Sequence, residues 1–272
     1  MRNPQAKRLY YIRVPIGDFT RCLYKNPVAR LLCNVFGAED IHTHYRVRSV
    51  LDFFARSITN EDELKILEVG CGGGTNLFEL AKQFRIRADG YDLDPEHIRI
   101  AGEINEKEFG SRIRFHVADA CTLAVNSEYD ALLLVDFLEH VPNPEQIIAA
   151  LSPSLKPGGI VCVSVPTPRY PQVFGREMHE RIGHLVDGYT PETLDRLFPP
   201  EYSRIETRYS TGPIGSVLCA IQARLIMKVA TPQLRWLCST PLLAIHNLDV
   251  INGPTVSATL FAVYRKSAAA VQ

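Results

Sequence analysis

A glycine-rich run at residues 65–76 constrains the fold more than any other stretch of the chain. It reads KILEVGCGGGTN. Ile66, Leu67 and Val69 form a short apolar run that is typical of a central parallel strand buried on both faces. The glycines that follow lack a Cβ, so the backbone can turn sharply and a ligand can approach it closely. The run therefore predicts a strand, a tight turn and the start of a helix, arranged to bind a nucleotide-like cofactor.

Strand-like and helix-like segments alternate from residue 65 onward. The expected strands are 65–70, 86–91, 112–118, 129–135 and 159–165, and the expected helices are 76–84, 95–109 and 144–152. Thr75 or Asn76 is the expected N-cap of the helix after the glycine turn. The alternation predicts an α/β fold with a doubly wound parallel sheet and helices on both faces, because such crossovers are right-handed.

Further elements flank this core. They are a helix at 46–58, a helix at 191–198 with Thr190 as its N-cap, and strands at 203–210 and 255–264. We expect four parts in the chain. These are a basic extension at 1–43, the core at 44–211, a helical insertion at 212–250, and a last strand with a tail at 251–272.

Composition limits the class of protein. With 272 residues and a formal net charge of zero, the chain can form one large domain, and general affinity for nucleic acid is not expected. The seven cysteines include no C-x-x-C pair, which favours a reducing compartment over a disulfide framework or a structural zinc site. We recognise no secretory leader and no run apolar enough to span a bilayer. We therefore expect a cytoplasmic protein.

An acid after the second expected strand favours a ribose site. Asp92 stands about 20 residues after the first glycine of the turn, where dinucleotide-binding folds place a carboxylate against the two ribose hydroxyls. An acid at a strand end can also cap a helix, but Asp94, directly before Pro95, is the better candidate for that cap. The dehydrogenase fingerprint G-x-G-x-x-G is not met, because Thr75 replaces its third glycine.

Five short motifs follow one another along the chain. They are the glycine run with its preceding Glu68, GYDLD at 90–94, ADA at 118–120, VDFLEHVP at 135–142 and LKPGG at 155–159. In this order they resemble the motifs of class I S-adenosylmethionine-dependent methyltransferases, most closely the small-molecule branch that includes ubiquinone-biosynthesis methyltransferases. The resemblance covers residues 44–200 and, more weakly, the last strand. It implies a seven-stranded, mainly parallel sheet with an antiparallel last strand at 254–265, and S-adenosylmethionine as the cofactor.

The resemblance also implies a set of cofactor-binding residues. They are Glu68, Gly70, Cys71, Gly72, Asp92, Leu93, Asp119, Ala120, Asp136 and Phe137. The glycine turn would line the methionine part of the cofactor, and Glu68 would shape the turn or reach the amino group. Asp92 would hold the ribose. Leu93, Asp119 and the backbone of the next residue would contact the adenine, and the pair at 136–137 would border the sulfonium and its methyl group.

The acceptor side of the site is less defined. His140 follows the fourth strand and is the candidate base for a hydroxyl acceptor, although the surrounding EHVP sequence could instead shape the loop or contact the cofactor. The loop at 166–189 is long for this fold and is the expected substrate lid. Its candidate substrate residues are Tyr170, Arg176, His184 and Tyr189. Arg176 or Arg181 could grip a carboxylate or a phosphate on the acceptor.

Two groups of histidines raise the question of a metal site. His42 and His44 have no carboxylate or cysteine beside them in the sequence, so packing or surface roles are favoured. His179 and His184 flank Glu180, but their spacing and the missing third partner disfavour a metal there. We therefore predict no metal.

Two stretches carry an excess of basic side chains. Residues 1–30 contain seven basic residues against one acid, Asp18; this extension either packs on the core or touches anionic lipid or an acidic substrate. Residues 212–248 contain three basic residues and no acid among many apolar ones. Pro232 and Pro241 are expected to cut this stretch into short pieces. A helical cap over the core, a dimer contact and an interfacial membrane patch all remain open for it, and the oligomeric state is not predicted.

The expected function is transfer of a methyl group from S-adenosylmethionine to a small-molecule, lipid-linked or sugar-linked acceptor, with oxygen as the expected target atom. One alternative is a non-catalytic module that binds this cofactor. A nicotinamide oxidoreductase is less favoured because of Thr75. A nucleic-acid methyltransferase is disfavoured by the neutral charge and by DFLE at 136–139, where an Asn-Pro-Pro-Tyr-like motif would be expected.

Overall fold

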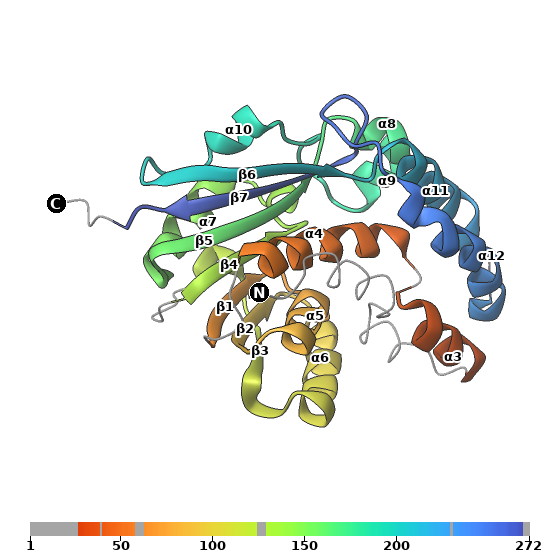
Figure 1. Ribbon diagram of the computed structural model, residues 1–272, viewed down its shortest axis with the longest axis horizontal. Helices are drawn as coiled ribbons and strands as arrows, with labels where there is room; N and C mark the ends of the chain where they lie inside the picture. Colours follow the sequence, from red (N-terminus) through yellow and green to blue (C-terminus); the bar gives the residue numbers. More distant parts are fainter. Residues whose placement is uncertain (1–26, 39, 58–62, 124–128, 229–230, 269–272) are drawn as a thin grey trace.

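A seven-stranded sheet forms the centre of the molecule (Figure 1). The structure is a computed structural model, and it describes residues 27–38, 40–57, 63–123, 129–228 and 231–268. The strands are β1 (Leu64–Val69), β2 (Ile86–Asp92), β3 (Ile113–Val117), β4 (Tyr129–Val135), β5 (Leu155–Pro166), β6 (Tyr202–Ser210) and β7 (Thr259–Lys266). Their order is β3-β2-β1-β4-β5-β7-β6. The pairs from β3 to β5 are parallel, and β7 is antiparallel to both of its neighbours. The predicted fold class is confirmed.

Helices cover both faces of the sheet. One face carries α4 (Ile41–Ser57), α5 (Thr75–Gln83) and α6 (Pro95–Glu108), and the other carries α7 (Pro144–Leu151) and α10 (Pro191–Asp195). Neighbouring residues of β1 belong to different cores, because Ile66 packs among the first group of helices and Leu67 among the second. This alternation explains why the strand is apolar throughout, since both of its faces are buried.

A third apolar cluster lies beyond the sheet. It joins α3 (Pro27–Phe36), α8 (Tyr170–Phe174), α11 (Pro213–Arg224) and α12 (Pro232–Ile245) through Cys33, Tyr170, Leu218, Trp236 and Leu243. With α9 (Arg176–Arg181), these helices form a cap at one end of the molecule, on the right in Figure 1. Within the part of the chain that the structure describes, no helix is long and apolar enough to cross a bilayer.

Short 3-10 helices complete the connections. They are η1 (Gly110–Arg112), η2 (Ala120–Thr122), η3 (Leu138–His140), η4 (Ser152–Ser154), η5 (Ile226–Lys228) and η6 (His246–Leu248). The predicted N-cap of α6 is confirmed, because the Asp94 side chain accepts from the backbone N–H groups of Glu96 and His97.

Three local predictions are wrong. Gly74, in the left-handed region at φ +77°, occupies the N-cap of α5 without a side-chain hydrogen bond, so neither Thr75 nor Asn76 caps this helix. Pro241 does not break the insertion, because α12 continues through it. The last strand begins at Thr259, later than expected, since a turn at 253–257 precedes it.

Candidate functional site

The glycine turn lies where the strand order reverses direction. β1 pairs with β2 on one side and β4 on the other, and the turn leaves β1 at its carboxyl end. Ligands of open α/β sheets bind at this kind of switch point. Gly70 and Gly72 have φ values of +72° and +50°, which other residues rarely adopt.

The two glycines serve different purposes. A Cβ on Gly70 would lie 2.7 Å from Cδ2 of Phe137, so Gly70 lets the Phe137 ring pack directly on the turn. A Cβ on Gly72 would meet no atom within 4 Å. The open space at Gly72 is where a ligand can reach the backbone.

Asp92 is tied to this turn at the end of β2. Its Oδ2 accepts a 2.7 Å hydrogen bond from the Gly72 N–H, and its Oδ1 accepts a 2.9 Å bond from the Asp94 N–H. The side chain stays partly accessible, and each carboxylate oxygen can accept a further hydrogen bond. Leu93 beside it is 66 % exposed, which leaves an apolar surface next to the carboxylate. This pair suits a ribose with an attached base.

Glu68 lies beneath the turn and is 1 % exposed. Its Oε1 accepts a 2.6 Å hydrogen bond from Asn76 Nδ2, and its Oε2 has no hydrogen-bond partner. Burial raises the pKa of Glu68 to about 8, although the bond from Asn76 and the charge of Arg46 oppose the rise. A buried acceptor that lacks a donor fits an ammonium group, such as the amino group of a methionine moiety.

The third strand supplies the far end of the site. Asp119 follows β3 and is exposed, and its Oδ1 accepts a 2.9 Å bond from the Cys121 N–H. Ala120 is buried at the start of η2, and Cys71 is buried in the glycine turn. A hydrogen bond of 3.0 Å from the Ala118 N–H to the Asp92 carbonyl holds this loop against β2. The predicted ribose and adenine residues therefore share one edge of the sheet.

Asp136 directly follows β4 and has a strained backbone conformation. Its φ is +49°, a region that non-glycine residues rarely occupy, and its N–H donates to the Ser164 carbonyl at 2.8 Å. Arg46 of α4 donates from Nη1 to Asp136 Oδ2 at 2.5 Å, and His42 Nδ1 lies 3.8 Å from the same oxygen. The Asp136 carboxylate raises the pKa of Arg46 against the effect of burial.

Arg46 was missed by the sequence reasoning. It pairs with Asp136 and its charge acts on Glu68, yet it comes from the helix that precedes the first motif. The available signal was weak: a basic residue between Tyr45 and Val47, both of which are buried. Its ion pair bridges 90 residues of sequence, which local pattern cannot foresee.

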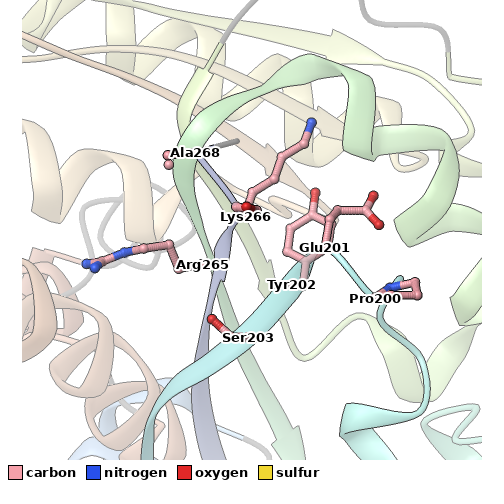
Figure 2. A pocket seen from close by; sticks show the side chains of 9 residues that line it. Pro200, Glu201, Tyr202, Ser203, Arg265, Lys266 and Ala268 are labelled. Atoms are coloured by element: carbon pink, nitrogen blue, oxygen red, sulfur yellow. The ribbon is translucent and has the colours of Figure 1, made fainter. Parts of the chain in front are cut away.

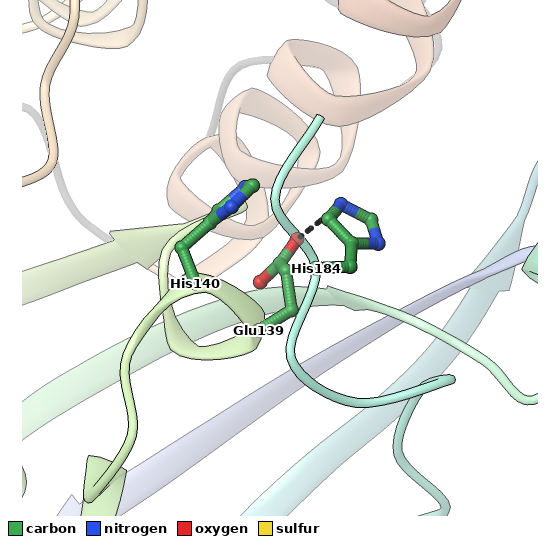
Figure 3. Close-up of side chains that lie close together, drawn as sticks. All are labelled: Glu139, His140 and His184. Atoms are coloured by element: carbon green, nitrogen blue, oxygen red, sulfur yellow. Dashed lines mark ion pairs between the residues drawn. The ribbon is translucent and has the colours of Figure 1, made fainter. Parts of the chain in front are cut away.

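Glu139, His140 and His184 meet on the acceptor side of this edge, as Figure 3 shows. His140 is exposed, and its Nδ1 lies 3.3 Å from the Gly183 carbonyl oxygen. His184 Nε2 lies 3.9 Å from Oε1 of Glu139, whose side chain is 1 % exposed. Burial raises the pKa of Glu139 well above its usual value. Burial, followed by His140 and His179, lowers the pKa of His184 to about 4. Burial therefore disfavours the charged form of both side chains.

The same three side chains bear on the question of a metal. Each offers one ligand atom, and these atoms lie within 4.8 Å of one another. This is a set that the sequence reasoning did not consider. The set that it did consider does not form, because His179 Nε2 is engaged by the Val186 carbonyl at 3.0 Å. The absence of a metal remains a prediction.

The four candidate substrate residues separate into two groups. Tyr170 stacks on Phe174 at 4.2 Å between ring centroids and lies 5.1 Å from the His184 ring, so these two candidates meet next to His140. Arg176 is exposed and pairs with Asp187 at 2.5 and 3.1 Å, and Asp187 borders the cluster of rings through His179, at 3.7 Å from its Nε2. Tyr189 is buried, and its hydroxyl donates to the Leu138 carbonyl at 3.1 Å. Tyr189 therefore anchors the lid to η3.

A separate cavity of about 640 Å³ is shown in Figure 2. It lies between the start of β6 and the end of β7, lined among others by Glu201, Tyr202 and Lys266. That is the amino edge of the parallel strands, opposite the glycine turn. None of the candidate site residues lines it.

The sequence of the chain matches a known protein family. A family model described as "Methyltransferase domain" matches residues 40–199, more than half of the chain. The chain belongs to this methyltransferase family. Among curated relatives, it is 34 % identical over 117 residues to a ubiquinone biosynthesis O-methyltransferase of Leptothrix cholodnii, covering 42 % of this chain and 49 % of that protein. The chain thus spans about half the length of the curated relatives it matches.

Solved structures share the methyltransferase fold at low identity. The [4+2]-cyclase SpnF is 19 % identical with a TM-score of 0.59, over 81 % of each chain. A phosphoethanolamine N-methyltransferase 2 of Haemonchus contortus, solved with S-adenosyl-L-methionine, is 16 % identical with a TM-score of 0.60, over 81 % of this chain and 52 % of that one. One of these neighbours is a cyclase, so the reaction has to be argued from the site.

Proposed function

We propose that this methyltransferase-family protein transfers a methyl group from S-adenosylmethionine to the oxygen of a small-molecule, lipid-linked or sugar-linked acceptor. The observation that carries the proposal is the hydrogen bond from the Gly72 N–H to Asp92. It lies at the point where the strand order reverses, and the backbone at Gly72 has open space next to it. The curated relatives are named O-methyltransferases, which supports oxygen as the target atom.

The residues of the site fit the parts of this cofactor. The open backbone at Gly72 accommodates the methionine part, and Oε2 of Glu68 is the acceptor for its amino group. Asp92 accepts from the ribose hydroxyls, Leu93 packs on the base, and Asp119 accepts from the adenine amine. When bound, the cofactor supplies a methyl group on a positively charged sulfur.

The protein contributes position and a proton acceptor. Phe137, packed on Gly70, and Asp136, held by Arg46, border the reacting methyl group and restrict the approach of the acceptor. Holding two reactants in line can supply several kcal/mol of the barrier. His140 accepts the proton of the acceptor hydroxyl, since it is exposed on the side where Tyr170 and His184 meet.

Two measurements test this proposal. Calorimetric titration should show binding of S-adenosylmethionine and no binding of NADH, and NADH binding would favour the oxidoreductase alternative. Release of S-adenosylhomocysteine should then be assayed over a panel of catechols, sugars and lipid-linked phenols. Binding without turnover on any acceptor would favour the non-catalytic module.

The remaining proposals concern the rest of the chain. We propose a cytoplasmic protein that contacts the membrane surface through residues 1–30 and 212–248, of which residues 1–26 and 229–230 lie outside the described part. The division at 1–43, 44–211, 212–250 and 251–272 is likewise a proposal. Its third part corresponds to the cap helices between β6 and β7.

A further inference from the structure

Helix α12 is apolar on two opposite sides. Trp236, Ser239 and Leu243 face the interior, and all three are at most 5 % exposed. The opposite side repeats every three or four residues with no charged residue. It consists of Leu234, Leu237, Cys238, Pro241, Ala244 and Ile245, all exposed. An exposed apolar side of this extent marks an interaction site.

The neighbouring helices repeat this pattern. On α11, Val217 and Leu225 are 58 % and 65 % exposed, one on either side of Ile221, and their spacing places them on one side of the helix. On α3, Leu31 and Val35 are 61 % and 59 % exposed and also share one side. α3 packs against α12, and all three helices lie at the same end of the molecule (Figure 1). We call the exposed apolar residues of α3, α11 and α12 the cap face.

The charged residues within α3 and within residues 212–248 are all basic. Arg30 on α3, Arg224 on α11 and Lys228 after it are exposed, and residues 212–248 contain no acid. The chain as a whole has no net charge, so this excess is local. In the sequence, six further basic residues precede Arg30. Apolar side chains with basic neighbours are the composition of helices that lie in a membrane interface.

The cap also adjoins the acceptor side of the site. Arg224 donates to the Val173 carbonyl at 3.0 Å, which ties α11 to the lid helix α8. Tyr170 and Phe174 of α8 pack in the same cluster as Trp236. One packed unit therefore has the cap face on its outside and Tyr170, beside His184, on its inside.

We propose that the cap face docks on an anionic lipid bilayer, with the apolar side chains in the interface and the basic residues at lipid phosphates. A second copy of the chain fits less well, since a symmetric contact would bring the same basic residues to both sides. Resting on the proposed function, this orientation lets an amphiphilic acceptor enter beneath the lid from the membrane surface.

Vesicle flotation of the full chain tests the docking. We expect the protein to float with vesicles of phosphatidylcholine and phosphatidylglycerol in equal parts, much less with phosphatidylcholine alone, and less at high salt. Leu237→Glu should lower the bound fraction by about tenfold, because it places a charge where an apolar side chain would enter the interface. Lys228→Gln should weaken binding to the anionic vesicles only.

The matched control is Ile205→Glu, which places the same charge at a 42 % exposed apolar position on β6. It should float like the unaltered protein. Equal flotation of the Leu237→Glu and Ile205→Glu variants, or none of the unaltered protein, would overturn the proposal. The proposal would also be overturned if sedimentation showed a dimer that the Leu237→Glu substitution dissociates while flotation stays unchanged. Titration with S-adenosylmethionine, run in parallel, shows separately whether the proposed function fails.

Discussion

Gly72 and Asp92 are joined by a hydrogen bond of 2.7 Å, from the backbone N–H of the glycine to Oδ2 of the carboxylate. The bond links the turn after β1 to the end of β2, the two places where a nucleoside-type ligand needs a bare backbone and a paired acceptor. Because Asp94 donates to the other oxygen, the carboxylate is held from both sides before any ligand arrives. Such fixed acceptors lose little freedom on binding.

Asp92→Ala should weaken S-adenosylmethionine binding by at least about tenfold, since it removes charge-assisted hydrogen bonds to the ribose. Titration calorimetry measures the change, and circular dichroism should show an intact fold. Asp94→Ala is the control. It removes the cap of α6 and should lower the free energy of unfolding without changing cofactor affinity. Unchanged affinity in Asp92→Ala would remove the ribose assignment.

Gly70→Ala should destabilise the protein by about 1–3 kcal/mol, because it combines a positive φ with a methyl group 2.7 Å from the Phe137 ring. Denaturant unfolding measures this. The comparison is Gly102→Ala in α6, where an added Cβ meets nothing within 4 Å and alanine should stabilise the helix by about 0.5–1 kcal/mol. Similar effects of the two substitutions would contradict the packing described at Gly70.

Arg46 and Asp136 should be energetically coupled. Their side chains are 28 % and 18 % exposed, so solvent screens the pair only in part. A double-mutant cycle with Arg46→Gln and Asp136→Asn should give a coupling of about 1 kcal/mol in the free energy of unfolding. Arg56 and Glu206 form a more exposed comparison pair at 2.8 Å and should couple more weakly. Additive effects at Arg46 and Asp136 would show that the contact stabilises nothing.

Glu68 should make stability and cofactor binding depend on pH. Its pKa rises on folding to about 8, so the folded state holds a proton that the unfolded state releases. This contribution to stability is complete below the unfolded value and is lost as the pH rises toward 8. Glu68→Gln, which can keep an acceptor for Asn76, should flatten the stability profile over that range.

The same group predicts proton release on binding. An ammonium group placed at Oε2 favours the charged form of Glu68, so S-adenosylmethionine should expel a proton at neutral pH. Calorimetry in buffers of different ionisation enthalpy detects it, and the Glu68→Gln variant should not show it. The same proton count for both proteins would argue against the amino-group assignment.

His140→Asn should lower kcat by about a hundredfold or more on a hydroxyl acceptor while S-adenosylmethionine still binds. His184→Asn is the informative comparison, because that ring faces Glu139 and is nearly buried. It should alter KM for the acceptor. A normal kcat in His140→Asn would leave the base unassigned.

The sheet and the cofactor edge could be predicted because their signals are local. The apolar run at β1 indicates a strand that is buried on both faces, and the turn residues come directly after it in the sequence. Arg46 and Glu139 could not be placed in this way. Arg46 reaches Asp136 only because α4 packs beside the turn, and Glu139 meets His184 only when the lid folds back. The same holds for the caps: Gly74 starts α5 because the turn needs a left-handed residue there.

The position of β7 also has a consequence for synthesis. β7 lies between β5 and β6, and β6 has no other strand to pair with in the sheet. During synthesis, β6 leaves the ribosome before the cap helices α11 and α12, and β7 follows them. β6 can therefore pair with β7 only after these helices have been synthesised. During that interval, the backbone N–H and C=O groups at one edge of the nascent sheet are unpaired. This is the period when a chaperone would be most useful.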